Sequence, residues 1–217
     1  MDLNGKKILV IGDSITEGVG VSDPKYLYWK RLEADGCHVF GYGISGTTIA
    51  RQMHLRINPY VDDNYFITRL PQMEPDADVI VILGGSNDYG HGDAALGTME
   101  DRTDDTFYGA LHHLFTACQK KYPHAAIIAM TPPHRLWENR VYNELNVRNM
   151  TTLEGYAKII QEVVDFYQIP CLDLYHVCPI DPEDEDQRKR YMPDGVHPND
   201  SGQELIYHLL RNLLKEL

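Results

Sequence analysis

Near its amino terminus the chain reads Lys7-Ile-Leu-Val-Ile-Gly-Asp-Ser-Ile-Thr-Glu17. The apolar residues 8–11 predict a short strand that is buried on both faces, as in the middle of a parallel sheet. Gly12 ends this strand, so that Asp13 and Ser14 fall in the tight turn that follows. A hydroxyl group is thereby placed at the carboxyl end of a central strand, where open α/β sheets form their ligand crevice.

Ser14 also has a purely structural interpretation. Ser14-Ile-Thr-Glu17 has the Ser-x-x-Glu spacing of a helix capping box. Gly18 and Gly20 follow at once, however, and leave little helix to cap. Ser22-Asp23-Pro24 is a better helix start, with proline at the first helical position. We therefore favour a functional role for Ser14.

The rest of the chain alternates between apolar segments and segments of helical periodicity. Strands are predicted at residues 38–42, 78–83, 125–130 and 169–174, and helices at 26–32, at 104–121, from the capping box at 151–154, and from 199–201 onward. Residues 47–77 predict one or two short helices before Pro75. This order predicts an α/β fold, a three-layer α/β/α sandwich with a five-stranded parallel sheet. No internal repeat or linker divides residues 1–217, which we interpret as one domain.

Composition narrows the range of partners and locations. The 217 residues include 20 basic and 32 acidic side chains, a net charge of −12 that argues against nucleic acid or an anionic membrane as the main partner. No apolar run approaches the roughly 18 residues of a membrane-spanning helix. Residues 1–7 lead directly into the first strand and leave no room for a signal peptide, which predicts a cytoplasmic protein.

The four cysteines form no Cys-x-x-Cys pair of the kind that binds metal; they are Cys37, Cys118, Cys171 and Cys178. We expect them to be small buried side chains in a reducing compartment.

Two connections, residues 131–150 and 175–197, are unusually long. Structureless loops of this length are uncommon in compact domains and usually serve a function. The second contains Asp181-Pro-Glu-Asp-Glu-Asp186 beside Arg188-Lys-Arg190. We favour a solvated surface loop for this second connection, with a lid or a subunit contact as the alternative. A homo-oligomer is a possible assembly of the chain.

Polar groups gather at the carboxyl end of the predicted strands. Ser14 follows the first strand, Gly46 the second and Asn87 the third, and the pair Asp194 and His197 comes after the fifth. In a parallel sheet these points converge on one crevice. Each has a structural explanation when taken alone, such as a turn residue or helix punctuation. Their shared location is what favours a functional site.

Four sequence blocks carry a resemblance to a known family. They are Gly12-Asp13-Ser14-Ile15, Ser45-Gly46, Gly85-Ser86-Asn87-Asp88 and Asp194-Gly-Val-His197-Pro. In this order the chain resembles the SGNH, or GDSL, hydrolase family from residue 8 to the final helix, which implies a flavodoxin-like SGNH hydrolase fold. One departure is Gly41, where many members of the family have asparagine before the second block.

The resemblance implies a nucleophile at Ser14, with His197 and Asp194 as the other members of a catalytic triad. It also implies an oxyanion hole that includes the N–H of Gly46 and the side-chain amide of Asn87. The chemistry agrees, because a serine hydroxyl needs a base to take its proton and an imidazole titrates near neutral pH. An aspartate three residues before the histidine would hold the ring in the correct tautomer. The N–H of Ser14 is a third oxyanion donor, and Asp13 is expected to hold the turn by hydrogen bonds.

Five side chains after the third and fourth strands are candidates for the acyl or alcohol pocket, with ordinary surface packing as the alternative for each; they are Tyr89, His91, His134, Arg135 and Trp137. No His-Glu-x-x-His or comparable cluster is present, so the predicted chemistry needs neither a metal nor another cofactor.

The sequence therefore predicts a serine esterase that hydrolyses small carboxylic esters, with a small-molecule ester as its partner. Short-acyl esters, such as acetyl groups on a carbohydrate, are the favoured substrates, and a lysophospholipase or thioesterase is the alternative within the family. A flavodoxin-like module that binds phosphate or flavin is the alternative of another class. Asp13 would repel an anion in that module, and Asp194 and His197 would have no task there.

Overall fold

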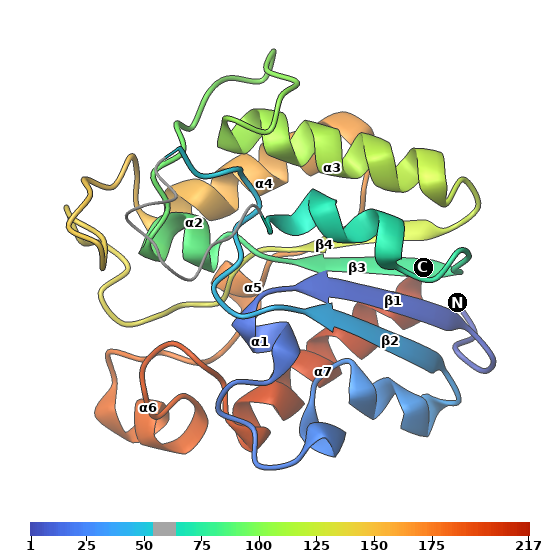
Figure 1. The fold of residues 1–217 in the computed structure, drawn as a ribbon. Helices are drawn as coiled ribbons and strands as arrows, with labels where there is room; N and C mark the ends of the chain where they lie inside the picture. Colours follow the sequence, from blue (N-terminus) through green and yellow to red (C-terminus); the bar gives the residue numbers. More distant parts are fainter. Residues whose placement is uncertain (54–63) are drawn as a thin grey trace.

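The computed structural model describes residues 1–53 and 64–217. Its centre is a five-stranded parallel sheet in the order β2-β1-β3-β4-β5 (Figure 1). The strands are β1 (Lys7–Gly12), β2 (His38–Gly43), β3 (Val79–Leu83), β4 (Ala126–Met130) and β5 (Cys171–Leu172). This order starts at β1 and grows to both sides, so the chain reverses direction across the sheet between β1 and β3 and creates the crevice expected at such a switch point. The predicted α/β/α fold is confirmed.

Alternate residues of each strand enter different cores. Leu9 and Ile11 of β1 pack on one face of the sheet, whereas Ile8 and Val10 pack on the other. Both faces are covered, which explains why the strands read as unbroken apolar runs instead of alternating ones.

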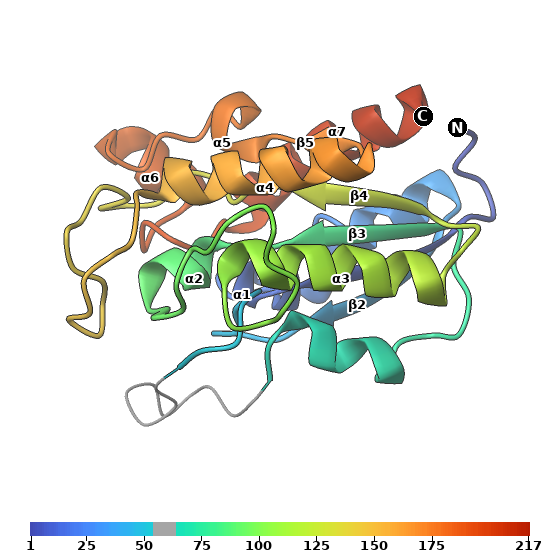
Figure 2. The same cartoon turned by 90° about the horizontal axis from the view of Figure 1, so that it is seen from above.

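Helices α3 (Phe107–Lys121) and α4 (Leu153–Tyr167) cover one face together with the 3₁₀ segment η3 (Phe66–Gln72). Figure 2 shows α3 and α4 lying side by side across the sheet. The other face is covered by α7 (Asp200–Glu216) and the 3₁₀ segment η2 (Lys30–Asp35), whereas the 3₁₀ segment η1 (Pro24–Tyr26) has no buried residue. The remaining helices are short: α1 (Ser14–Glu17), α2 (Ser86–Gly90), α5 (Leu174–Val177) and α6 (Glu185–Tyr191).

Three segments differ from the sequence prediction. The helix expected at 26–32 is two 3₁₀ segments, because the N–H of Tyr28 donates to the Gln203 side chain (2.9 Å) and not to the preceding turn. Strand β5 is only two residues long; it lies at the sheet edge, and Pro170 before it has no N–H to donate. The connection 175–197 is not a structureless loop, since it contains α6 and the end of α5.

One short helix precedes Pro75, namely η3, and residues 54–63 of the same segment lie outside the described residues. All four cysteines are free, and Cys171 is half-buried while the others are buried. Within residues 1–53 and 64–217, no helix has the length and apolar character needed to cross a membrane.

Candidate active site

The turn after β1 presents Ser14 without using its hydroxyl to cap a helix. Asp13 is the N-cap of α1, and its carboxylate accepts the N–H of Ile15 at 3.0 Å. Ser14 is the first helical residue, and Gly18 ends the helix after a single turn with φ of 107°. The capping box is therefore not formed by Ser14, and Asp13 holds the turn as expected.

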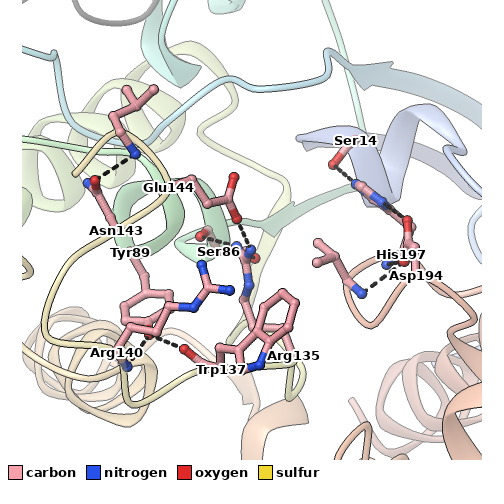
Figure 3. Close-up of polar contacts among 12 residues, drawn as sticks. Ser14, Ser86, Tyr89, Arg135, Trp137, Arg140, Asn143, Glu144, Asp194 and His197 are labelled. Atoms are coloured by element: carbon pink, nitrogen blue, oxygen red, sulfur yellow. Dashed lines mark hydrogen bonds and ion pairs between the residues drawn. The ribbon is translucent and has the colours of Figure 1, made fainter. Parts of the chain in front are cut away.

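Ser14, His197 and Asp194 form a continuous hydrogen-bonded chain (Figure 3). His197 Nε2 lies 2.9 Å from Ser14 Oγ, and His197 Nδ1 lies 2.6 Å from Asp194 Oδ2. Because the Nδ1–H donates to the carboxylate, Nε2 is left as the acceptor for the serine proton. The geometry is that of a general base held next to a nucleophile.

Asp194 is fixed by its own backbone turn. Its Oδ1 accepts the N–H groups of Val196 (2.9 Å) and His197 (2.7 Å). Partial burial alone would raise the pKa of Asp194, but these bonds and the His197 side chain outweigh it and lower the pKa below its usual value. The carboxylate is therefore ionised when His197 needs it as a partner.

The loop after β2 carries Gly46 in the left-handed region, with φ of 75°. A Cβ at this position would meet nothing within 4 Å, so the backbone conformation and not space requires glycine. His91 Nε2 lies 2.9 Å from Gly46 O, and burial lowers the pKa of His91, which favours a neutral ring that donates to this carbonyl. Within the described chain, the N–H groups of Ser14 and Gly46 donate to no protein acceptor.

Asn87 lies in α2, directly after β3, and lines the same cleft. One N–H of its side-chain amide donates to Thr47 O at 2.9 Å. An amide carries two such donors, so the second is left for a ligand. Ser14, Gly46 and Asn87 thus bring three N–H groups to one place.

Two carboxylates hold the Gly46 loop, and sequence analysis gave neither this role. Glu17 of α1 accepts both the N–H (2.7 Å) and the hydroxyl of Ser45. Asp88, buried beside Asn87, accepts the N–H groups of Ile49 (3.0 Å) and Ala50 (2.9 Å). Burial raises the pKa of Asp88 to about 7 and that of Asp13 to about 6.

Arg69, which sequence analysis did not single out, is a buried cation beneath the site. Its guanidinium donates to Gly12 O (2.5 Å), Tyr42 O (2.6 Å) and Thr47 Oγ1 (3.0 Å). Burial lowers the pKa of Arg69 to about 10, and the nearby charge of Asp13 opposes this shift. One side chain thereby joins the ends of β1 and β2 to the Gly46 loop. The only sequence signal is a lone charged residue in the uncharged stretch around it, Phe66-Ile-Thr-Arg-Leu.

Gly41, the departure from the family pattern, is explained by Trp29. A Cβ at Gly41 would collide with the indole ring, whose Nε1 donates to Thr16 O at 2.8 Å. The Gly46 loop is instead supported by Glu17, Asp88 and Arg69.

A cleft of about 270 Å³ opens beside the Ser14 hydroxyl. Its lining residues are Ser14, Val19, Ser45, Gly46, Asn87, His91, Arg135, Glu144, Val196 and His197. Of the five pocket candidates, His91 and Arg135 line this cleft.

The contacts of Tyr89, His134 and Trp137 lie elsewhere. Tyr89 is buried, and its hydroxyl donates to Trp137 O (2.5 Å) and accepts the N–H of Arg140 (2.9 Å). The Trp137 ring is stacked against the Arg140 guanidinium, 4.0 Å from the ring centre. His134 pairs with Glu138 at 2.9 Å, a contact that raises its pKa. These three residues shape the connection 131–150 but do not line the cleft beside Ser14.

The residues that the structure describes contain no group of three or more His, Cys, Asp or Glu side chains placed to hold a metal ion.

A parallel sheet covered on both faces, with a Ser–His–Asp chain at the carboxyl ends of its strands, is an arrangement typical of serine hydrolases of α/β architecture. Residues 10–205 match the model of the GDSL-like Lipase/Acylhydrolase family. The chain belongs to this family and is a hydrolase that acts on esters.

Solved structures share the fold over nearly the whole chain. A protein from Lactobacillus plantarum is 29% identical, with a TM-score of 0.81 over 98% of this chain and 98% of that chain. Another crystal structure is 28% identical, with a TM-score of 0.86 over 100% of this chain and 99% of that one. A lipase/acylhydrolase from Enterococcus faecalis is 24% identical, with a TM-score of 0.62 over 97% and 96% of the two chains. The comparison with curated proteins found no match.

Proposed function

We propose that this protein is a serine esterase that removes short acyl groups, acetyl above all, from a carbohydrate or a similar polar alcohol. The observation that carries the proposal is the chain of hydrogen bonds from Ser14 through His197 to Asp194, which opens onto a cleft of about 270 Å³.

The reaction would proceed in two halves. Ser14 Oγ attacks the ester carbonyl while His197 Nε2 takes the hydroxyl proton. The negative charge that develops on the carbonyl oxygen is met by the N–H groups of Ser14, Gly46 and Asn87. His197 then gives its proton to the departing alcohol, which leaves an acyl group on Ser14. Water, deprotonated by His197, then attacks this acyl-enzyme, and His197 returns the proton to Ser14 Oγ as the acid leaves.

The cleft supports a short acyl group and a polar alcohol. Among its described lining residues, Val19 and Val196 carry the only apolar side chains. A long acyl chain needs an extended apolar lining, because its binding depends on the apolar area removed from water. The lysophospholipase alternative is therefore less well supported.

Acyl preference is tested with p-nitrophenyl esters of two to twelve acyl carbons, assayed beside acetylated sugars. We expect kcat/KM to be highest for acetate or propionate and to fall with each added pair of carbons. A maximum at eight carbons or more would contradict the short-acyl proposal and favour the lipase-like alternative.

The flavodoxin-like alternative is tested separately by the visible absorption spectrum of the purified protein. Flavin bands would support it, together with a lack of ester hydrolysis. The carboxylate of Asp13 at the first turn argues against an anionic ligand there.

A further inference from the structure

Glu144 lines the cleft beside Ser14, and only one of its two carboxylate oxygens has a protein partner within the described chain. Its Oε1 accepts from the Arg135 guanidinium, whereas its Oε2 has no protein partner within the described chain. The Glu144 side chain is 47% exposed, and both residues line the cleft that contains Ser14. Figure 3 shows the Arg135–Glu144 pair on one side of the site and Ser14 with His197 on the other.

The position of this carboxylate is fixed from two directions. The backbone N–H of Glu144 donates to Gly90 O (2.9 Å), at the end of the short helix that carries Asn87. The neighbouring Asn143 side chain donates to Gly92 O (2.9 Å) and accepts the N–H groups of Leu145 and Val147 (3.0 Å each). Glu144 is thereby held in register with the oxyanion donors.

Arg135 orients the carboxylate, and its one nitrogen without a partner among the described residues, Nε, is buried. Arg135 itself is buried, and its Nη1 donates to Ser86 O at 3.2 Å while its Nη2 is occupied by Glu144. An anionic substrate would have to displace Glu144 from this pair. The group presented to the cleft is instead a carboxylate oxygen, which is a strong hydrogen-bond acceptor.

We propose that Glu144 binds a free hydroxyl group on the alcohol part of the substrate, next to the ester that Ser14 attacks. The inference rests on the proposed esterase function. A short acyl group has no hydroxyl to donate, so the donor must belong to the alcohol. Glu144 thus selects neutral polyols that carry unesterified hydroxyl groups.

The test compares three acetyl esters: a monoacetylated methyl glucoside, the fully acetylated methyl glucoside, which has no free hydroxyl, and p-nitrophenyl acetate. The variant is Glu144→Gln, which keeps the size of the side chain and a carbonyl oxygen for Arg135 but places an uncharged NH₂ donor where the free oxygen was. We expect the ratio of kcat/KM for the monoacetylated over the fully acetylated sugar to fall about tenfold, mainly through KM, because a charged hydrogen bond is lost.

The matched control is Glu185→Gln, which removes the same charge from an exposed ion pair with Lys189 and does not line the cleft. We expect this control to leave the ratio unchanged. Binding of the monoacetylated sugar to Ser14→Ala, with and without Glu144→Gln, gives a second measurement without turnover, and we expect about tenfold weaker binding in the double variant.

Two results would overturn the inference while leaving the esterase intact. One is an equal effect of Glu144→Gln on all three esters, which would make Glu144 only the structural partner of Arg135. The other is wild-type hydrolysis of p-nitrophenyl acetate without a preference for the monoacetylated sugar. Failure to hydrolyse any ester would instead contradict the proposed function.

Discussion

Ser14 and His197 are 183 residues apart in the chain and 2.9 Å apart in space. The contact depends on single side chains around them: Asp13 fixes the turn that presents the hydroxyl, and Asp194 fixes the imidazole. Neither supporting carboxylate needs to touch the substrate.

Ser14→Ala is expected to lower kcat for p-nitrophenyl acetate by about 10⁴-fold or more, because the nucleophile is lost. Asn87→Ala, which removes one oxyanion donor, is expected to cost about 10²–10³-fold. Steady-state kinetics on both purified variants, with folding checked by circular dichroism, make the measurement. Unchanged turnover by Ser14→Ala would refute the proposed mechanism.

Asp88 makes stability depend on pH in a defined direction. Its pKa is raised by burial from 3.8 to about 7, so the folded state keeps a proton that the unfolded state has already lost. The contribution of Asp88 to the free energy of unfolding of the wild type should therefore fall as pH rises from about 4 to about 7, by up to about 1.4 kcal/mol per pH unit. Asp88→Asn cannot titrate, so its deficit relative to wild type should shrink over that range.

Urea unfolding of both proteins at half-unit pH steps measures this difference. Asp186→Asn on the exposed surface of α6 is the control, and its difference from wild type should vary far less with pH. A deficit for Asp88→Asn that grows with pH would contradict the assigned direction.

The 3₁₀ segment η3 is joined to the sheet by hydrogen bonds from a side chain and not by bonds from its backbone. Its Arg69 is the donor for the ends of β1 and β2 and for the Gly46 loop at once. Buried carbonyl groups that lose their donor are costly, so η3 stabilises the site as well as covering the sheet.

Arg69→Met keeps the length of the side chain and removes all its donors. We expect a loss of about 2–5 kcal/mol in the free energy of unfolding, and a fall in kcat of at least about tenfold as the Gly46 loop loosens. Arg102→Met, at an exposed position, should change either quantity little. Wild-type stability and kcat in Arg69→Met would show that the three bonds contribute nothing.

The long elements were predictable and the short ones less so. Helices α3, α4 and α7 were predicted from apolar periodicity, which is a local signal, although the N-cap of α4 is Thr152 and not Thr151 of the predicted capping box. The 3₁₀ segments at 24–35 were not, because Gln203 from the far end of the chain takes the N–H of Tyr28. Helix α6 was missed because its exposed, charged sequence has no apolar periodicity to detect.

At the scale of the whole molecule, α7 joins the two ends of the chain. Gln203 is fully buried, donates to Ile15 O and accepts the N–H of Tyr28, each at 2.9 Å. Leu210 and Leu214 of the same helix pack on the sheet. The helix therefore holds the segment that carries His197 against α1, and it also covers one face of the sheet.

Gln203→Ala should cost about 2–5 kcal/mol in stability, because two buried backbone groups lose their partners. Leu210→Ala should cost a similar amount through the cavity that it leaves. Only Gln203→Ala is expected to lower kcat at a temperature where both variants are folded, since it alone loosens α7 from the turn that carries Ser14. Equal kcat values in the two variants would contradict this positioning role.

The strands, the long helices and the residue types of the site could be predicted from local patterns, because periodicity and short motifs are properties of neighbouring residues. The tertiary structure decided which distant groups support that site. Glu17, Asp88 and Arg69 hold the Gly46 loop through bonds to segments that are remote in sequence. It also decided that His91, Arg135 and Glu144 line the cleft while Tyr89, His134 and Trp137 turn to other partners. Such choices follow from how loops pack against one another, and no local pattern records that.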